Sequence, residues 1–320
     1  MKRLNNLYEK IISIENLMLA DEKARKGKQK QYGILLHDRN READILKLHE
    51  DLKNKNYKTS EYKVFKIFET KEREIFALPY FPDRIVHHAI MNVLEPIFVA
   101  NFTADTYSCI KGRGIHKASF AVRKALKNVD ETTYCLKLDI VKFYPNIDHD
   151  ILKMQLRRKF KDEDLLWLLD EIIDSAPGLP IGNYLSQYLA NFYLSNIDHY
   201  LKEELRVKYY FRYADDIVIL DSNKEKLKVL FLAIKNYLSG ILNLETKGNW
   251  QIFPVAARGI DFVGYVHFHT HTKLRKSIKQ RFARMLKKRQ NMQSIASYNG
   301  WLKHCNSKHL TKKLLADVQL

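Results

Sequence analysis

The sequence predicts an α+β fold, and two features of its patterning support this. Runs with the helical spacing of apolar residues are mixed with short runs in which apolar and polar residues alternate as they do in strands. Near the middle of the chain, two strand-like runs flank a tight turn, which predicts a hairpin within a sheet backed by helices. No repeat with a period of roughly 20 to 50 residues is present, so a solenoid or a propeller is not expected.

Each element follows from this patterning in chain order. Apolar spacing predicts helices over residues 4–19, 38–52, 82–98, 115–127, 147–160 (with Asn146 as its cap), 162–174, 184–205 and 224–238. Alternation predicts strands over residues 64–68, 74–78, 134–140, 208–213 and 217–220, with further short strands between 242 and 268. The first two of these strands are expected to form a ribbon, and basic helices are expected to close the chain.

Composition limits the classes of function. The 320 residues are 46% hydrophobic, which excludes a wholly disordered chain and suits about two compact units. The net charge of +18 favours a polyanionic partner, nucleic acid before a membrane surface. The three cysteines are far apart, so neither a disulfide framework nor a thiolate zinc site is expected, and a cytoplasmic location is predicted. No apolar run approaches the roughly 20 residues that span a bilayer.

The charge is concentrated at one end of the sequence. Residues 271–320 contain 13 Lys or Arg residues and one acid, Asp317, so this segment has +12 of the net charge. Such a segment is either a clamp for a phosphate backbone or merely a solvated helix face. Phe282, Met285 and Leu286 lie at helical spacing within it, which favours a folded basic helix.

Two adjacent acids, Asp215 and Asp216, interrupt the apolar, strand-forming run 211–220. Two buried like charges are costly unless a cation neutralises them, although a purely structural turn is an alternative. Asp139 stands at the end of the alternating run 134–140 and points away from the face of Leu138 and Ile140. If the two segments are neighbours, three carboxylates meet, as a two-Mg²⁺ phosphoryl-transfer site requires.

These residues resemble motifs of the reverse transcriptases, and the resemblance covers nearly the whole chain. Tyr213-Ala-Asp-Asp216 and Asp139-Ile-Val-Lys-Phe-Tyr144 are similar to the two metal-site motifs of that family. The resemblance implies catalysis by Asp139, Asp215 and Asp216, with Ile140 also at the metal site, and two Mg²⁺ ions for which Mn²⁺ could substitute. It also implies that Tyr144 is a steric gate that excludes ribonucleotides by their 2′-hydroxyl.

The resemblance implies a right-hand polymerase fold with fingers, a palm built on an antiparallel sheet, and a helical thumb. The corresponding domain boundaries are residues 1–133 for an N-terminal extension and fingers, 134–268 for the palm, and 269–320 for the basic thumb. The segment of about 146–177 is expected to be a helical contribution to the fingers within the palm region.

The segment 178–187 resembles a narrower group. Most reverse transcriptases have Gln-Gly and a closing Ser-Pro here, whereas this chain has Ile181-Gly182 and Ser186-Gln187. This pattern is similar to the enzymes of diversity-generating retroelements, which copy a template RNA with errors at adenines. Isoleucine cannot form the hydrogen bonds of a glutamine amide, so we expect Ile181 to lower fidelity.

The resemblance also indicates nucleotide and nucleic-acid contacts. Arg73, and less strongly Lys71, match the fingers ribbon that holds the triphosphate, and either could instead be merely solvated. Lys111 or Arg113 would contact phosphate, and Lys247 could protonate the departing pyrophosphate. The resemblance also implies that Gly182 and Gln187 bind the nucleotide, together with Ile181 and Tyr144. The predicted thumb contacts to nucleic acid are Arg275, Lys276, Lys279, Arg281, Lys287 and Lys288.

Three histidines, His267, His269 and His271, alternate after a segment that resembles the hairpin gripping the primer end. A zinc site is conceivable, but the exposed face of an edge strand is the more ordinary explanation.

The predicted function is therefore an RNA-directed DNA polymerase of a diversity-generating retroelement. Its expected partners are template RNA, the RNA–DNA duplex, dNTPs and a small basic accessory protein, with no membrane. A retron-like or antiphage reverse transcriptase is an alternative, and a non-catalytic RNA-binding scaffold is an alternative of another class.

Overall fold

The structure is a computed structural model, and it describes residues 3–68, 72–288 and 292–315. The chain forms two compact units. The first unit comprises Met1–Thr103, Val141–Asp198 and Leu238–Leu244, and the second comprises Ala104–Ile140, His199–Tyr237 and Glu245–Leu320. Each unit is therefore assembled from separated stretches of sequence, and each is described by itself.

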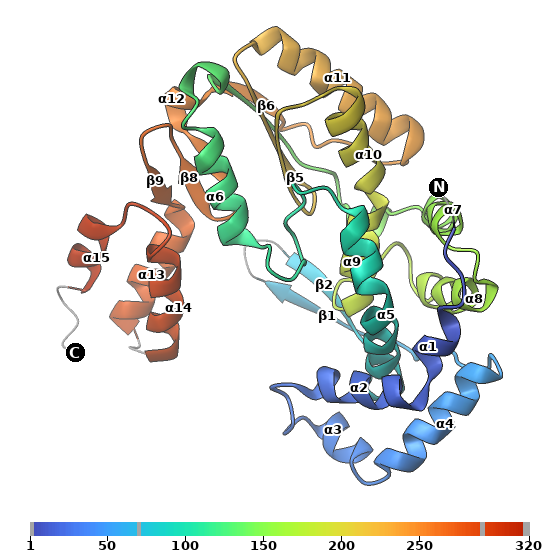
Figure 1. The fold of residues 1–320 in the computed structure, drawn as a ribbon. Helices are drawn as coiled ribbons and strands as arrows, with labels where there is room; N and C mark the ends of the chain where they lie inside the picture. Colours follow the sequence, from blue (N-terminus) through green and yellow to red (C-terminus); the bar gives the residue numbers. More distant parts are fainter. Residues whose placement is uncertain (1–2, 69–71, 289–291, 316–320) are drawn as a thin grey trace. The chain divides into compact units, whose positions relative to one another are not determined.

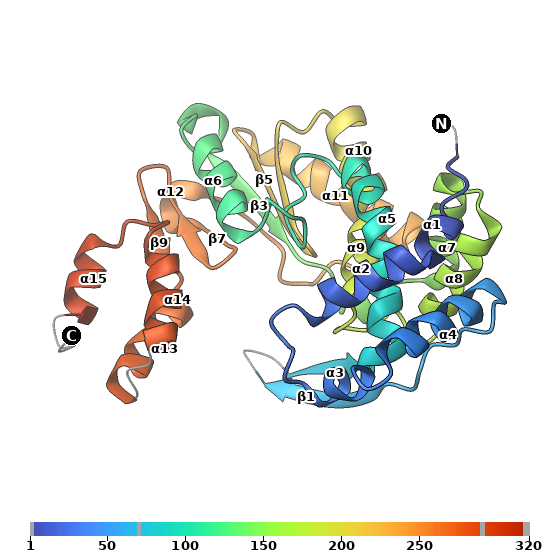
Figure 2. The same cartoon turned by 60° about the horizontal axis from the view of Figure 1, so that its bottom comes forward.

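The first unit is mostly helical. Its helices are α1 (Tyr8–Ile12), α2 (Ile14–Arg25), α3 (Tyr32–His37), α4 (Arg41–Lys53), α5 (Ile85–Asn101), α7 (His149–Lys159), α8 (Glu163–Ile173) and α9 (Tyr184–Tyr193). The apolar helix α5 contacts both α2 and α9, and these helices lie side by side (Figure 2). Strands β1 (Lys63–Phe68) and β2 (Glu72–Ala77) form the predicted antiparallel ribbon.

Two predictions for these helices were wrong in detail. The expected helix 4–19 breaks at Ser13, whose hydroxyl accepts a hydrogen bond from the Asn16 backbone and starts α2. Asp148 rather than Asn146 caps α7, because its carboxylate accepts from the Ile151 N–H. An aspartate also caps α8, where Asp162 accepts from the Leu165 N–H. Carboxylates at these positions also interact favourably with the helix dipole.

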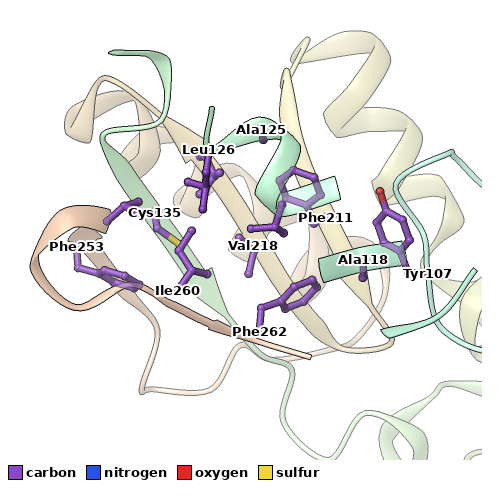
Figure 3. Packing of buried hydrophobic residues seen from close by; sticks show 13 residues of the cluster. Tyr107, Ala118, Ala125, Leu126, Cys135, Phe211, Val218, Phe253, Ile260 and Phe262 are labelled. Atoms are coloured by element: carbon purple, nitrogen blue, oxygen red, sulfur yellow. The ribbon is translucent and has the colours of Figure 1, made fainter. Parts of the chain in front are cut away.

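The second unit is built on a four-stranded antiparallel sheet. Its strands are β3 (Tyr134–Leu138), β4 (Tyr209–Tyr213), β5 (Asp216–Asp221) and β6 (Gln251–Pro254), in the spatial order β4-β5-β3-β6. Helix α6 (Ile115–Ala125), drawn in green in Figure 1, contacts β4 of this sheet. Phe211 and Val218 of the sheet gather with Ala118 of α6 and with Phe262 in one hydrophobic core (Figure 3).

Helical segments connect these strands along the chain. Most of α10 (Ser195–His199) belongs to the first unit, and a π-helical turn over Tyr200–Glu204 follows it. Helices α11 (Lys224–Ile241) and α12 (Val255–Arg258) come later in the chain. The predicted helix 184–205 is thus divided into α9, α10 and this turn. No helix in the part of the chain that the structure describes has the length and apolar composition needed to cross a membrane.

A second, three-stranded sheet and three helices follow the first sheet. The strands are β7 (Ile260–Phe262), β8 (Tyr265–His267) and β9 (Thr272–Leu274), and the helices are α13 (Lys276–Lys288), α14 (Met292–Leu302) and α15 (Lys308–Leu315). Helix α13 buries Ile278, Phe282 and Leu286, while Lys279 and Arg281 are exposed. The prediction of a folded basic helix is confirmed.

Candidate active site

The two adjacent acids stand at the hairpin between β4 and β5. Tyr213 pairs with Asp216, so Ala214 and Asp215 form the turn. Ala214 has a φ of 54°, a region that residues other than glycine rarely adopt. The buried Arg212 guanidinium donates a hydrogen bond to the Ala214 carbonyl at 3.0 Å. This contact supports the turn that presents Asp215.

Strand pairing brings the third acid to the same edge of the sheet. Strand β3 pairs with β5 in a register that sets Leu138 opposite Ile217, so one step further Asp139 lies beside Asp216. Asp215 is also close enough to Asp139 for each carboxyl group to shift the pKa of the other. The pairing of the strands thus places the three predicted acids at one edge of the sheet.

Lys247 contacts Asp139 twice. Its backbone N–H donates to the Asp139 carbonyl at 2.8 Å, and its ammonium group pairs with the Asp139 carboxylate. Ile140, which follows Asp139, is fully buried and forms an isolated bridge with Thr246. The segment before β6 is therefore attached to the end of β3, and this attachment sets the position of Lys247.

Burial controls the protonation of this cluster. Burial raises the pKa of Asp215 to about 7, and the nearby Asp139 adds to that rise. Burial likewise raises the pKa of Asp216 to about 6, although Lys137 opposes the change. Burial also acts to raise the pKa of Asp139, but hydrogen bonds from Asp215 and Lys247 hold it below its usual value. Lys137 and Lys247 thus offset only part of the effect of burial on these three acids.

The carboxylates fit a hard divalent cation. The Oδ1 atoms of Asp139 and Asp216 are buried and have no hydrogen-bond partner among the described residues. The other oxygens face lysines, since Lys137 lies 3.5 Å from Asp216 and Lys247 binds Asp139. Within the described ranges, no three His, Cys, Asp or Glu side chains are already spaced as metal ligands. A bound ion would therefore replace the lysine contacts of these acids, and oxygen donors suit Mg²⁺.

A cavity of about 510 Å³ opens beside Asp139 and Asp216. Its polar lining includes Lys137, Asn249, Gln251, Arg258 and Asp261. Lys137 donates to the backbone carbonyl of Asp261, whose side chain binds Arg275 at 2.6 Å. The predicted nucleic-acid contact Arg275 thus has its charge balanced by Asp261.

The predicted nucleotide contacts Tyr144, Ile181 and Gly182 come together within the first unit. The Leu179 N–H donates to the Tyr144 carbonyl at 2.9 Å, and the Phe76 N–H of β2 donates to the Ile181 carbonyl at 2.8 Å. A side chain at Gly182 would lie 2.6 Å from the Phe76 carbonyl, and its φ is 127°, so this position needs glycine. The tyrosine turn, the 178–187 loop and the ribbon are therefore in contact.

The other predicted site residues have simpler surroundings. Arg73 on β2 is exposed, Gln187 on α9 is half-buried, and Lys111 is exposed. Arg113 donates to the Thr106 carbonyl at 3.0 Å. Lys276, Lys279 and Arg281 are exposed on α13. Lys71 lies outside the described residues, as do the side chains of Lys287 and Lys288.

The three histidines do not form the exposed edge expected for them. His267 is fully buried in β8, the central strand of its sheet, beside Thr272. His269 contacts Thr132, and His271 stacks on Phe268 with ring centroids 4.6 Å apart. Each ring has a different neighbour, so nothing in their arrangement supports a shared zinc site. The edge-strand prediction failed because alternation does not reveal which strand is central.

Comparison with known proteins identifies the family. The profile described as "Reverse transcriptase (RNA-dependent DNA polymerase)" matches residues 54–265. The chain belongs to this reverse transcriptase family. It is 24% identical over 233 residues to Protein YkfC of Escherichia coli, covering 59% of this chain and 61% of YkfC. It is 29% identical over 149 residues to the Retron Ec73 reverse transcriptase of Escherichia coli, covering 42% of this chain and 46% of that protein.

A solved structure supports the fold of this reverse transcriptase. The telomerase of Candida albicans, solved with a fragment of telomeric RNA, matches with a TM-score of 0.50 at 11% identity, over 73% of this chain and 51% of that chain. The predicted right-hand polymerase fold is thus confirmed. This chain spans about half to three fifths of the length of these relatives.

Sequence reasoning missed two residues of the reverse transcriptase site, Lys137 and Arg212. Both are cations within apolar strand runs: Lys137 lies two residues before Asp139, and Arg212 lies three residues before Asp215. A basic residue inside such a run needs a buried acceptor, and this was the available signal. The acceptors themselves, on Asp261 and Ala214, could not be identified from the pattern.

Proposed function

We propose that this reverse transcriptase is an RNA-directed DNA polymerase that copies a template RNA into cDNA from dNTPs. The observation that supports this best is the pairing of β3 with β5, which sets Asp139 beside Asp216 with a buried, unpartnered oxygen on each. Such oxygens are stabilised by metal ions at phosphoryl-transfer centres. A scaffold that only bound RNA would have no need to bury these carboxylates.

In this proposal Asp139, Asp215 and Asp216 hold two Mg²⁺ ions, for which Mn²⁺ could substitute, and Ile140 contributes at the same place. Bound ions of this kind lower the pKa of the attacking 3′-hydroxyl and stabilise the leaving pyrophosphate. Lys247, which pairs with Asp139 in this structure, would hold a proton at its Nζ atom for the departing pyrophosphate. Tyr144 excludes the 2′-hydroxyl of a ribonucleotide, and Arg73 donates to the triphosphate.

The finer proposal is a diversity-generating retroelement enzyme that makes errors at template adenines and works with a small basic accessory protein. It is supported by Ile181-Gly182 and Gln187, and by the contact of the Ile181 backbone with β2. The ribbon contact fixes the main chain there, so the identity of the Ile181 side chain can change base discrimination without moving the loop.

A retron-like reverse transcriptase is the second candidate. It is favoured by the 29% identity to the Retron Ec73 reverse transcriptase. The two candidates differ in the cDNA that they make and in the neighbours of their genes. A diversity-generating retroelement has a pair of template and variable repeats nearby, whereas a retron has a gene for a non-coding RNA.

Deep sequencing of cDNA made from a defined RNA tests both levels. We expect a product whose errors concentrate at template adenines, and no product from Asp215→Asn. A cDNA without these errors would support the polymerase activity but would contradict the proposal that the enzyme is error-prone. Absence of product with Mg²⁺, Mn²⁺ and a structured template RNA would overturn the polymerase itself.

A further inference from the structure

The first unit has an open hollow of about 750 Å³ that the proposed chemistry does not use. It lies between α7, α8 and the start of the chain. Its lining residues are Arg3, Asp150, Lys153, Met154, Arg157, Arg158 and Asp170. The volume falls within the range of roughly 300–1,000 Å³ that is usual for ligand sites. Four cations and two acids make the lining net positive.

The cations of this hollow differ in their partners. Lys153 pairs with Asp174 at 2.5 Å, and Arg157 pairs with Asp170. Arg3 and Arg158 have no carboxylate partner among the described residues, since Arg3 contacts only the Arg157 carbonyl and Arg158 only the Met154 sulfur. The two paired cations are fixed in place, and the two others are available to an anion.

The backbone around Arg3 is held firmly. Leu4 forms a bridge with Phe160, in which the Leu4 N–H donates to the Lys159 carbonyl at 2.9 Å and the Lys161 N–H donates to the Leu4 carbonyl at 2.8 Å. The Asp162 carboxylate accepts from the backbone N–H groups of Leu7 and Tyr8. The start of the chain is therefore attached to the end of α7, which sets Arg3 beside Arg157.

Helix stability does not account for this arrangement. Basic residues in the last turn of α7, such as Arg157 and Arg158, interact favourably with the helix dipole. Arg3 is not on that helix, yet it is brought to the same place. Beside these cations Met154 is 45% exposed, and an exposed thioether offers an apolar surface against which a base can pack.

We propose that this hollow binds the phosphodiester backbone of RNA outside the duplex that is copied. Arg3 and Arg158 donate to successive phosphates, and Met154 contacts a base. The identity of the ligand rests on the proposed function, because a reverse transcriptase that copies RNA meets this polyanion in every cycle. The hollow thereby anchors unpaired template RNA.

Binding measurements with the full chain in EDTA test this without catalysis. The probe is an unprimed RNA hairpin with a long single-stranded tail, followed by fluorescence polarisation over a salt series. The variant is Arg3→Glu with Arg158→Glu, and Arg3→Gln with Arg158→Gln removes charge without adding repulsion. The matched control is Arg39→Glu with Lys47→Glu, two exposed cations of the same unit.

We expect the Arg3/Arg158 variants to bind the RNA about tenfold more weakly. The slope of log affinity against log salt should fall by about 1.4, because two single-strand phosphate contacts are lost. Parental affinity in both Arg3/Arg158 variants would overturn the proposal, and so would an equal loss in the control. Extension of a short oligonucleotide primer–template should stay at the parental rate. Failure of the parent in that reaction would count against the polymerase assignment, while the loss of hairpin binding would still report on the hollow.

Discussion

The two units position their chemistry-bearing residues in different ways. In the second unit, strand register brings Asp139 and Asp216 together, and side-chain charges on Lys137 and Lys247 neutralise them. In the first unit, the backbone does the positioning, since Gly182 approaches the Phe76 carbonyl more closely than any side chain would allow.

This difference indicates which changes each region tolerates. Ion pairs join side chains, so those of the acid cluster can be exchanged for other ion pairs while the register of the strands stays the same. A close backbone approach cannot be exchanged in this way, because an added Cβ displaces the chain itself. Substitutions in the second unit should therefore affect chemistry before stability, and those at the first unit's glycines should do the reverse.

The largest effect is expected at the start of β5. This strand begins with Asp216 and ends with Asp221, which provides a matched pair of aspartates. Asp216→Asn should lower primer extension at least about a thousandfold, or about 4 kcal/mol, because an amide cannot neutralise a bound cation. Single-turnover extension with dNTPs measures this loss.

The control is Asp221→Asn, which removes an ion pair with the exposed Lys226, while the amide oxygen can still accept the hydrogen bond from the Asn223 N–H. Its extension rate should stay within about twofold of the parent, since such pairs contribute about 0–1 kcal/mol. Equal rates for the two variants would show that the position of the carboxylate in β5 does not matter.

The second largest effect is expected for Arg212→Met. It removes a buried guanidinium that donates to the Ala214 carbonyl, and hydrogen bonds of charged groups contribute about 1.5–3 kcal/mol. Denaturant unfolding should show a loss of this order, accompanied by slower extension because the Asp215 turn loosens. Arg281→Met, on the exposed face of α13, should unfold like the parent. A stable Arg212→Met with full activity would mean that the strands alone define the turn.

The Gly182→Ala substitution tests the close backbone approach in the first unit. The added methyl would meet the Phe76 carbonyl in a backbone conformation that side chains rarely adopt, at a cost of about 1–3 kcal/mol. We expect the melting temperature of this unit to fall by about 2–4 °C for each kcal/mol lost. Gly248→Ala has no atom within 4 Å of the new methyl and should melt like the parent. If Gly182→Ala and Gly248→Ala had the same melting temperature, the close approach of Gly182 to Phe76 would not contribute to stability.

Sequence patterning was most reliable where the signal is local. The alternation that ends at Asp139 and the interrupted run at Asp215 both reappear as strands of one sheet, because apolar alternation reports directly on burial. The end of the helix at Ser13 was missed since apolar spacing continues across it, although a serine is a common N-cap.

The sequence could not predict which residues far apart in the chain contact each other. Lys247 lies 108 residues from Asp139, and no local pattern indicates which lysine neutralises that carboxylate. The burial of His267 depends on β9 pairing beyond β8, which the alternation of three histidines cannot reveal. These contacts follow from tertiary assembly, so they could be found only in the structure.

The smallest effect concerns the side chain of Ile181 rather than its backbone. Its carbonyl is already occupied by the Phe76 N–H, so Ile181→Gln should retain the loop and change only what the side chain can bind. One added hydrogen bond of about 1 kcal/mol should lower misincorporation opposite template adenine about fivefold. Sequencing of cDNA from one RNA measures this, with Ile181→Val as the apolar control that should copy the parental errors. An unchanged error rate in Ile181→Gln would show that the side chain at this position does not affect fidelity. The 178–187 loop would then have only a structural role, unlike the acid cluster.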